Sequence, residues 1–205
     1  MAIVTWPLDD ADLCPNQMTL ALRSNVLIRN STMNGEIQTS QIPGTRWVMG
    51  LTLPPNISQL VQSKIEALIT SAEGQAHRFA IPHLNRRVPN GTMRGNPVSL
   101  GAIRGARSMV ISSTTNATLL PGDMLGVTTS MGAQLIMVTG SYTTPGTGSI
   151  MITFAGPLRG AVAIGSGVIW NAPTAIFIST STDIAVSHAV DGNPGVRLEL
   201  MEVFG

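Results

Sequence analysis

The sequence predicts a mainly β protein of the α+β class, in which a sheet is flanked by one α-helix and a small β-barrel is inserted. Three observations predict this fold. Residues 46–53 alternate between apolar and polar or small side chains, residues 56–74 carry one apolar helical stripe, and residues 106–171 read as five or six short strands with no helix between them.

The segment from 44 to 84 predicts strand, helix, strand. Asn56 is the expected N-cap of the helix, with Gln59 as its capping-box partner, and Gly74 is the expected end. A helix with one apolar stripe must pack on an apolar surface, which here is a sheet. The stripe is Ile57, Val61, Ile65, Leu68 and Ala72.

Further strands are predicted on both sides of this segment. Residues 19–29 alternate with one irregularity, residues 35–39 form a short strand, and residues 41–44 are predicted as a tight turn into the strand at 46. Residues 174–179 and 196–204 predict two more strands. The sheet therefore needs segments from both ends of the chain.

The domain boundaries follow from a change in the residue pattern. Residues 85–97 are rich in turn residues and have no hydrophobic period. From Pro173 onward the strand pattern of the first part of the chain returns. The predicted organisation is a helix-flanked sheet domain of residues 1–94 plus 172–205, and an inserted barrel of residues 95–171.

The composition favours self-assembly. Charged residues are only 11% of the 205-residue chain, whereas an ordinary soluble domain has about 25%. A surface so poor in charge is expected to be covered by other subunits. Lys64 is the only lysine beside eleven arginines. This excess of arginine is typical of protein interfaces, but codon bias in a GC-rich genome would explain it equally well. The net charge of +1 gives no strong field toward nucleic acid or membranes.

The sequence contains no recognisable motif for catalysis or for binding a metal or a cofactor. The three histidines have no metal-ligand spacing, Cys14 is alone, and the run Asp9, Asp10, Asp12 lacks the glycine turn and late glutamate of a calcium loop. The sequence therefore predicts a protein that is not an enzyme. Five basic residues between Arg86 and Arg107 predict either a bridge to a neighbouring domain or subunit, or a nucleic-acid contact.

Two sets of segments resemble a known family. The first is Pro43–Pro55 followed by the amphipathic helix and a strand. The second comprises Leu120–Asp123, Gln134–Thr139, Pro157–Arg159 and Ala172–Phe177. Together they resemble small tail proteins of tailed bacteriophages, especially distal tail proteins of the long non-contractile type. The resemblance implies a tail-tube-like β-sandwich with a flanking helix, assembled as a ring, with six subunits expected.

On this resemblance the expected function is that of a structural virion protein. Its partners would be copies of itself and the tail tube, hub and fibres. DNA would pass through the lumen without specific binding, and no membrane is involved. No secretion leader is visible, so assembly is expected in the host cytoplasm. The residues expected at self-association contacts are Arg46, Trp47, Arg86, Arg87, Arg197 and Glu199.

Other functions stay open from the sequence. A head–tail connector or a capsid-decorating protein would also be a virion part. A nucleic-acid-binding module would use the linker from Arg86 to Arg107. A carbohydrate-binding barrel would need an aromatic platform, for which Trp6, Tyr142 and Trp170 are few and scattered.

Overall fold

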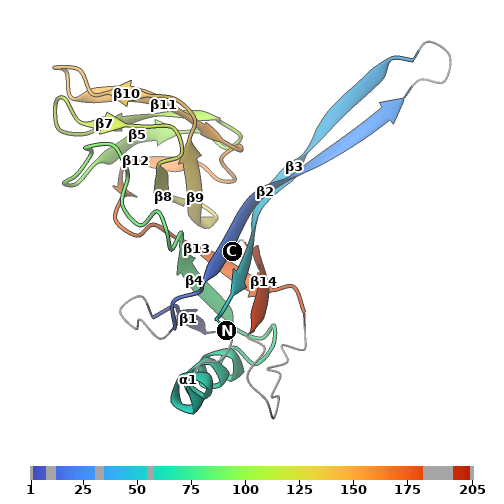
Figure 1. Ribbon diagram of the computed structural model, residues 1–205. Helices are drawn as coiled ribbons and strands as arrows, with labels where there is room; N and C mark the ends of the chain where they lie inside the picture. The colour runs from blue at the N-terminus through green and yellow to red at the C-terminus, as the bar shows by residue number, and fades with distance from the viewer. Residues whose placement is uncertain (1, 8–12, 31–34, 55–57, 182–195, 204–205) are drawn as a thin grey trace.

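A computed structural model describes residues 2–7, 13–30, 35–54, 58–181 and 196–203, without the side chains of residues 41–43. Its described part is mainly β with one helix, as the sequence predicts, and it contains a closed barrel. Figure 1 shows the barrel and a long hairpin rising from opposite sides of a sheet that carries the helix.

The sheet has six strands in the order β1-β4-β13-β14-β3-β2. Neighbouring strands are antiparallel, except for the parallel pair β1 and β4. The two central strands, β13 and β14, come from the C-terminal part of the chain and lie between β4 and β3 of the N-terminal part. The strands are β1 (Ile3–Thr5), β2 (Gln17–Asn30), β3 (Ile37–Thr52), β4 (Arg78–Pro82), β13 (Thr174–Ser179) and β14 (Arg197–Glu202).

Helix α1 (Gln59–Thr70) covers one face of this sheet. In a β-sandwich a second sheet would cover that face, and here the helix does so. Its N-cap is Ser58, whose hydroxyl accepts a hydrogen bond from the backbone N–H of Val61. The expected cap Asn56 lies outside the described residues. The helix is therefore shorter than the predicted range 56–74, and Gly74 lies beyond it in a left-handed turn.

Strand β3 corrects one prediction. The expected turn at residues 41–44 is wrong, because β3 runs without a break from Ile37 to Thr52 and joins the two strands predicted on either side. The pairing with β2 shifts register between Arg23 and Asn25, so that residues 43–45 of β3 form a bulge opposite Ser24. A bulge accepts a proline because it leaves a residue outside the ladder of hydrogen bonds.

The barrel closes in the order β11-β6-β5-β12-β8-β9. The sequence does not predict β5 (Val98–Ala102), and it places only the end of β12 (Val162–Ile169) in a strand. The other strands are β6 (Ser108–Ser112), β8 (Met124–Thr129), β9 (Gly132–Val138) and β11 (Ser149–Ala155), with a separate pair β7 (Thr118–Leu119) and β10 (Tyr142–Thr143).

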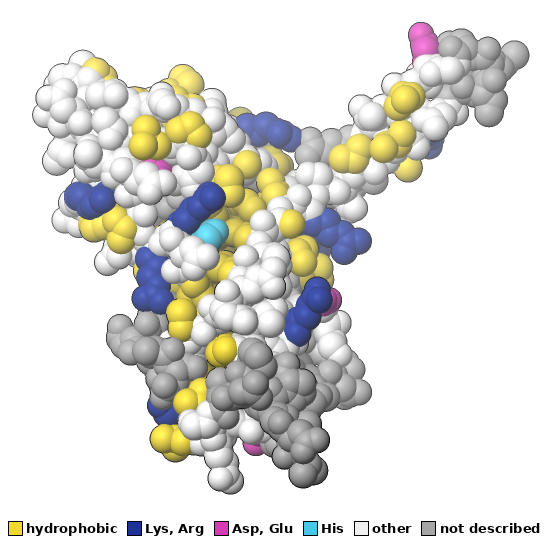
Figure 2. All heavy atoms as spheres, in the orientation of Figure 1, with side chains coloured by type: hydrophobic (Ala, Val, Ile, Leu, Met, Phe, Trp, Pro, Cys, Tyr) yellow, Lys and Arg dark blue, Asp and Glu magenta, His cyan; other side chains and the backbone are white. Residues whose placement is uncertain are grey.

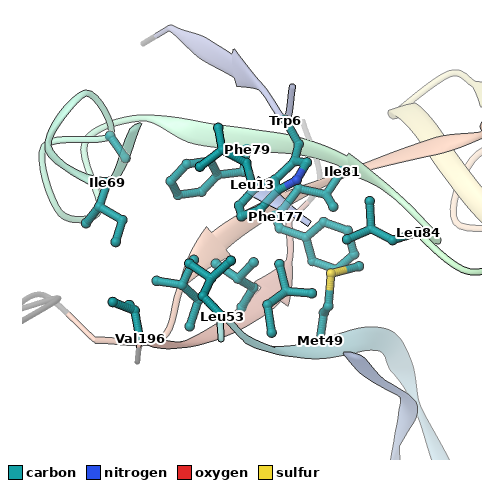
Figure 3. Packing of buried hydrophobic residues seen from close by; sticks show 14 of the residues in the cluster. Trp6, Leu13, Met49, Leu53, Ile69, Phe79, Ile81, Leu84, Phe177 and Val196 are labelled. Atoms are coloured by element: carbon teal, nitrogen blue, oxygen red, sulfur yellow. The ribbon is translucent and has the colours of Figure 1, made fainter. Parts of the chain in front are cut away.

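Two hydrophobic cores match the two parts. The core of the sheet lies between the strands and α1, with Met49, Phe79 and Phe177 facing one another (Figure 3). Met124 and Leu135 of the barrel belong to this same core, so the two parts are continuous at their junction. The barrel encloses its own core, which is aliphatic apart from Phe154 among its buried residues.

The segment before β5 is attached to the barrel. The buried carboxylate of Asp123 accepts backbone hydrogen bonds from Asn90 (2.7 Å), Gly91 (3.2 Å) and Leu120 (2.8 Å). Met93 is buried in the barrel core. Residues 90–94 therefore contact the barrel, although the sequence assigns them to the sheet domain.

Candidate functional site

The most unusual feature is the outer half of the β2–β3 hairpin, called here the arm (residues 25–30 and 37–42). Its strands pair from Asn25 with Ile42 to Asn30 with Ile37. The arm extends away from the sheet and the barrel as a two-stranded ribbon (Figure 1). A two-stranded ribbon alone is at best marginally stable in water, because it has no third strand or helix to cover its faces.

The arm exposes apolar side chains on both faces. Val26 and Ile28 point to one face of β2, at 48% and 61% exposure, and Leu27 points to the other at 44%. Ile37 on β3 is 67% exposed. Figure 2 shows hydrophobic side chains along the arm. The ribbon cannot bury both faces against its own chain, so these apolar side chains stay exposed in the single chain.

The sheet face opposite α1 is also apolar in part. A row of side chains crosses it, because Ala21 pairs with Val48, Val48 with Met201 and Met201 with Ile178. Val48, Met201 and Ile178 are half-buried, and α1 lies on the other side. We call this surface the open face. It ends at the root of the arm.

The root of the arm carries two arginines directly opposite each other. Arg23 on β2 pairs in register with Arg46 on β3. Together with Asn25, Gly44 and Met201 they line a hollow of about 230 Å³. Gly44 has φ +131°, a backbone conformation that side chains other than glycine rarely adopt. The sequence shows the arginines, but their pairing depends on the register across the bulge.

A buried polar cluster joins the barrel to the sheet. Arg159, after β11, forms an ion pair with Glu202 of β14 and donates to the carbonyl oxygen of Thr45 at 3.2 Å. The other partner of Glu202 is the backbone N–H of Trp47, at 2.9 Å. The indole N–H of Trp47 donates to the carbonyl oxygen of Leu135. These bonds fix the barrel to the sheet.

The predicted contact residues divide into two groups. Arg46 is half-buried, whereas Arg197 and Glu199 are exposed and form an ion pair at 3.0 Å on the open face. Trp47, also predicted at a contact between subunits, is 2% exposed in the single chain and packs at the junction with the barrel.

Arg86 and Arg87 lie in the linker between sheet and barrel. A side-chain N–H of Arg86 donates to the carbonyl oxygen of Gly122 at 3.3 Å, and one of Arg87 donates to that of Leu84 at 3.2 Å. These bonds stay within the chain, so both residues connect the linker to its surroundings. The structure does not bring them to the pair Arg23–Arg46 as one patch: they share neither its strands nor its hollow.

The basic linker contains further internal contacts. Arg94 donates to the carbonyl oxygens of Gly91 and Met93, at 2.9 and 2.6 Å, and its guanidinium lies 5.0 Å from the ring centre of Trp170. A guanidinium over an indole face is a favourable cation–π contact. Arg94 therefore organises the linker against the barrel, which the run of arginines alone does not reveal.

Histidine and acidic residues form no dense group in the described ranges, where no set of three His, Cys, Asp or Glu side chains could hold a metal ion. The predicted aspartate run at 9–12 lies outside them. Burial, and then the nearby charge of Arg86, lower the pKa of His83 below its ordinary value. Of the helices in the described ranges, none is long and apolar enough to cross a membrane.

Neither the protein-family models nor the curated protein sequences yield a match to this chain. The class that its geometry defines is a mainly β protein with a closed barrel and an extended arm.

Proposed function

We propose that this protein is a ring-forming structural subunit of a phage tail, of the distal tail type that links the tail tube to the tail tip and fibres. The single observation that carries the proposal is the arm. An unsupported ribbon with apolar side chains on both faces needs another chain to cover it. A neighbouring copy supplies that cover in a symmetric assembly.

The edges of the sheet support a repeating contact. Strand β2 is at one edge and is 14 residues long, whereas β1 at the other edge has only three residues. A long unprotected edge strand is a template for pairing with another chain. A contact between two different surfaces of successive copies closes into a ring when the rotation between copies is an integral fraction of a turn.

The charge balance supports a passage for DNA without retention. The chain has twelve basic and eleven acidic residues. A lumen lined by excess arginine and lysine would hold the phosphate backbone through counterion release. Three of the five linker arginines, Arg86, Arg87 and Arg94, donate to carbonyl oxygens of the same chain. The nucleic-acid-binding alternative is therefore less favoured.

Imaging the purified protein tests the proposal. The expected result is a closed ring with a central hole, and a particle mass near six times the 21.5 kDa subunit. Labelling the protein in an intact particle would then separate a distal tail position from a head–tail connector. A chain that stays monomeric at all concentrations and joins no particle would overturn the proposal.

A further inference from the structure

The outer wall of the barrel carries a row of apolar side chains across four consecutive strands, from β11 through β6 and β5 to β12. Met151 pairs with Val110, and Leu100 pairs with Ile164. The register between β5 and β6 puts Leu100 next to Val110. Met151 is 60% exposed, Leu100 42% and Ile164 79%, so the row faces solvent and not the barrel core. We call these four residues the barrel row.

The surface beside the barrel row is low and uncharged. The next rung across the same four strands consists of Ser149, Ser112, Val98 and Gly167. A Cβ atom on Gly165 or Gly167 would meet nothing within 4 Å, so no side chain overhangs Ile164 from this side. Another backbone can therefore approach the row closely, and ion pairs play no part in what binds there.

One face of the arm has the same character. Val26 and Ile28 point to one side of β2, and Ile37 points to that side too, because its partner is Asn30. These three apolar side chains are 48%, 61% and 67% exposed. We call them the apolar arm face. The opposite face of the arm carries Leu27, Arg29, Gln38 and Ser40.

The two apolar surfaces have nearly the same length. The apolar arm face extends over four residues from Val26 to Asn30, which is about 13 Å at a rise of about 3.3 Å per residue. The barrel row spans three gaps between strands, which is about 14 Å at about 4.8 Å per gap. An arm that lies along the row crosses the barrel strands at a right angle, as in the orthogonal packing of two sheets. In that position the arm covers the whole row.

We propose that the apolar arm face binds the barrel row of a neighbouring copy. The inference rests on the proposed function and names the surface that receives the arm. The arm of a chain extends away from its own barrel, so the contact joins two copies (Figure 1). Neither surface carries a charge that would lose its hydration in the contact. Each copy has one arm and one row, so every copy in a closed ring gives one contact and receives one.

Cross-linking between full-length chains tests the proposal. Every variant also carries Cys14→Ser, because Cys14 is exposed and could react. A chain with Ile28→Cys and a tagged chain with Ile164→Cys are mixed, assembled and oxidised. The expected product is a disulfide-linked dimer of one tagged and one untagged chain. The matched control is Ile169→Cys, since Ile169 is also on β12, is 48% exposed and pairs with Gly126 outside the row.

Threonine substitutions measure the same contact without cross-linking. Ile28→Thr and Ile164→Thr keep a β-branched side chain, and each is expected to weaken association by about tenfold because apolar area is lost. The double variant is expected to be weakened by less than the product of the two single effects, since the residues touch. Leu27→Thr, on the opposite arm face, and Ile169→Thr are expected to leave association unchanged. Sedimentation velocity measures all forms, with circular dichroism to verify folding.

The outcomes separate this proposal from the proposed function. An assembling wild type whose Ile28→Cys and Ile164→Cys chains form no mixed dimer would overturn the proposal and leave the ring intact. Weakened association of Ile28→Thr alone would overturn it too, because the arm would then bind another surface. Normal self-association of Ile164→Thr with lost incorporation into particles would assign the barrel row to a different tail protein, and would also overturn it. A monomeric wild type would overturn both proposals.

Discussion

The indole N–H of Trp47, on β3 of the sheet, donates a 2.9 Å hydrogen bond to the carbonyl oxygen of Leu135, on β9 of the barrel. The two residues are 88 positions apart in the sequence. Because both residues belong to one buried core, the barrel is joined to the sheet at this point. In the proposed ring, a neighbouring copy that binds the sheet would thereby also fix the direction in which the barrel of the bound copy points.

Replacing Trp47 by phenylalanine is expected to lower the free energy of unfolding by about 1–3 kcal/mol. The aromatic ring remains, but the buried carbonyl of Leu135 loses its donor. Chemical denaturation measures the change. Trp170→Phe is the matched control, because the Trp170 indole bonds to Gly95 in an exposed position where water can replace it. Equal effects of the two changes would contradict a role for the junction bond.

Replacing Arg159 by methionine is expected to cost about 3–5 kcal/mol of folding free energy. The carboxylate of Glu202 is fully buried, and its charge would be left without its cation. Arg104→Met, in an exposed turn of the barrel, is expected to be near neutral and controls for the loss of an arginine. Thermal unfolding of the three proteins decides, and an Arg159 variant as stable as the control would refute the coupling.

Gly91→Ala is expected to destabilise the linker against the barrel by about 1–3 kcal/mol, the usual range for overpacking. A Cβ atom there would lie 2.1 Å from the backbone oxygen of Thr118, which cannot move as a side chain end could. Gly146→Ala meets nothing within 4 Å and should leave the melting temperature unchanged. Similar melting temperatures for both variants would show that the linker adjusts freely.

Acid is expected to destabilise the protein through His83. Burial, and next the charge of Arg86, lower the pKa of His83 in the folded state, so the unfolded chain binds the proton more readily. The contribution of His83 to stability is therefore complete above pH 6.5 and is lost as the pH falls below that value. Comparing melting temperatures between pH 5 and 8 for wild type and His83→Gln isolates this term. Parallel curves would contradict it.

Patterns with one buried face could be predicted from the sequence. The alternation of Trp47, Met49 and Leu51 fixes which side of β3 faces the core, since a shift by one residue would turn all of them to solvent. The same reasoning holds for α1, whose buried residues Val61 and Ile65 belong to the predicted stripe.

Features that depend on distant pairing could not be predicted. Pro43 and Gly44 are typical turn residues, and only the bulge that β3 makes against β2 shows how β3 continues through them to form the arm. In β5, Gly101 at φ +96° interrupts the alternation and the strand was not predicted. The partner of Trp47 lies in the other part of the chain, so an aromatic residue expected at a contact between copies is a core residue.

Shortening the arm tests the central claim most directly. Joining Asn25 to Ile42, which pair in register, through a two-residue Asn-Gly loop closes the hairpin at its root with a favoured turn and leaves the sheet, α1 and the barrel unchanged. Sedimentation velocity of this variant beside the full-length chain is predicted to show a folded monomer and a closed oligomer, respectively. If both proteins sediment as oligomers with the same number of copies, the result would contradict an assembly held together by the arm.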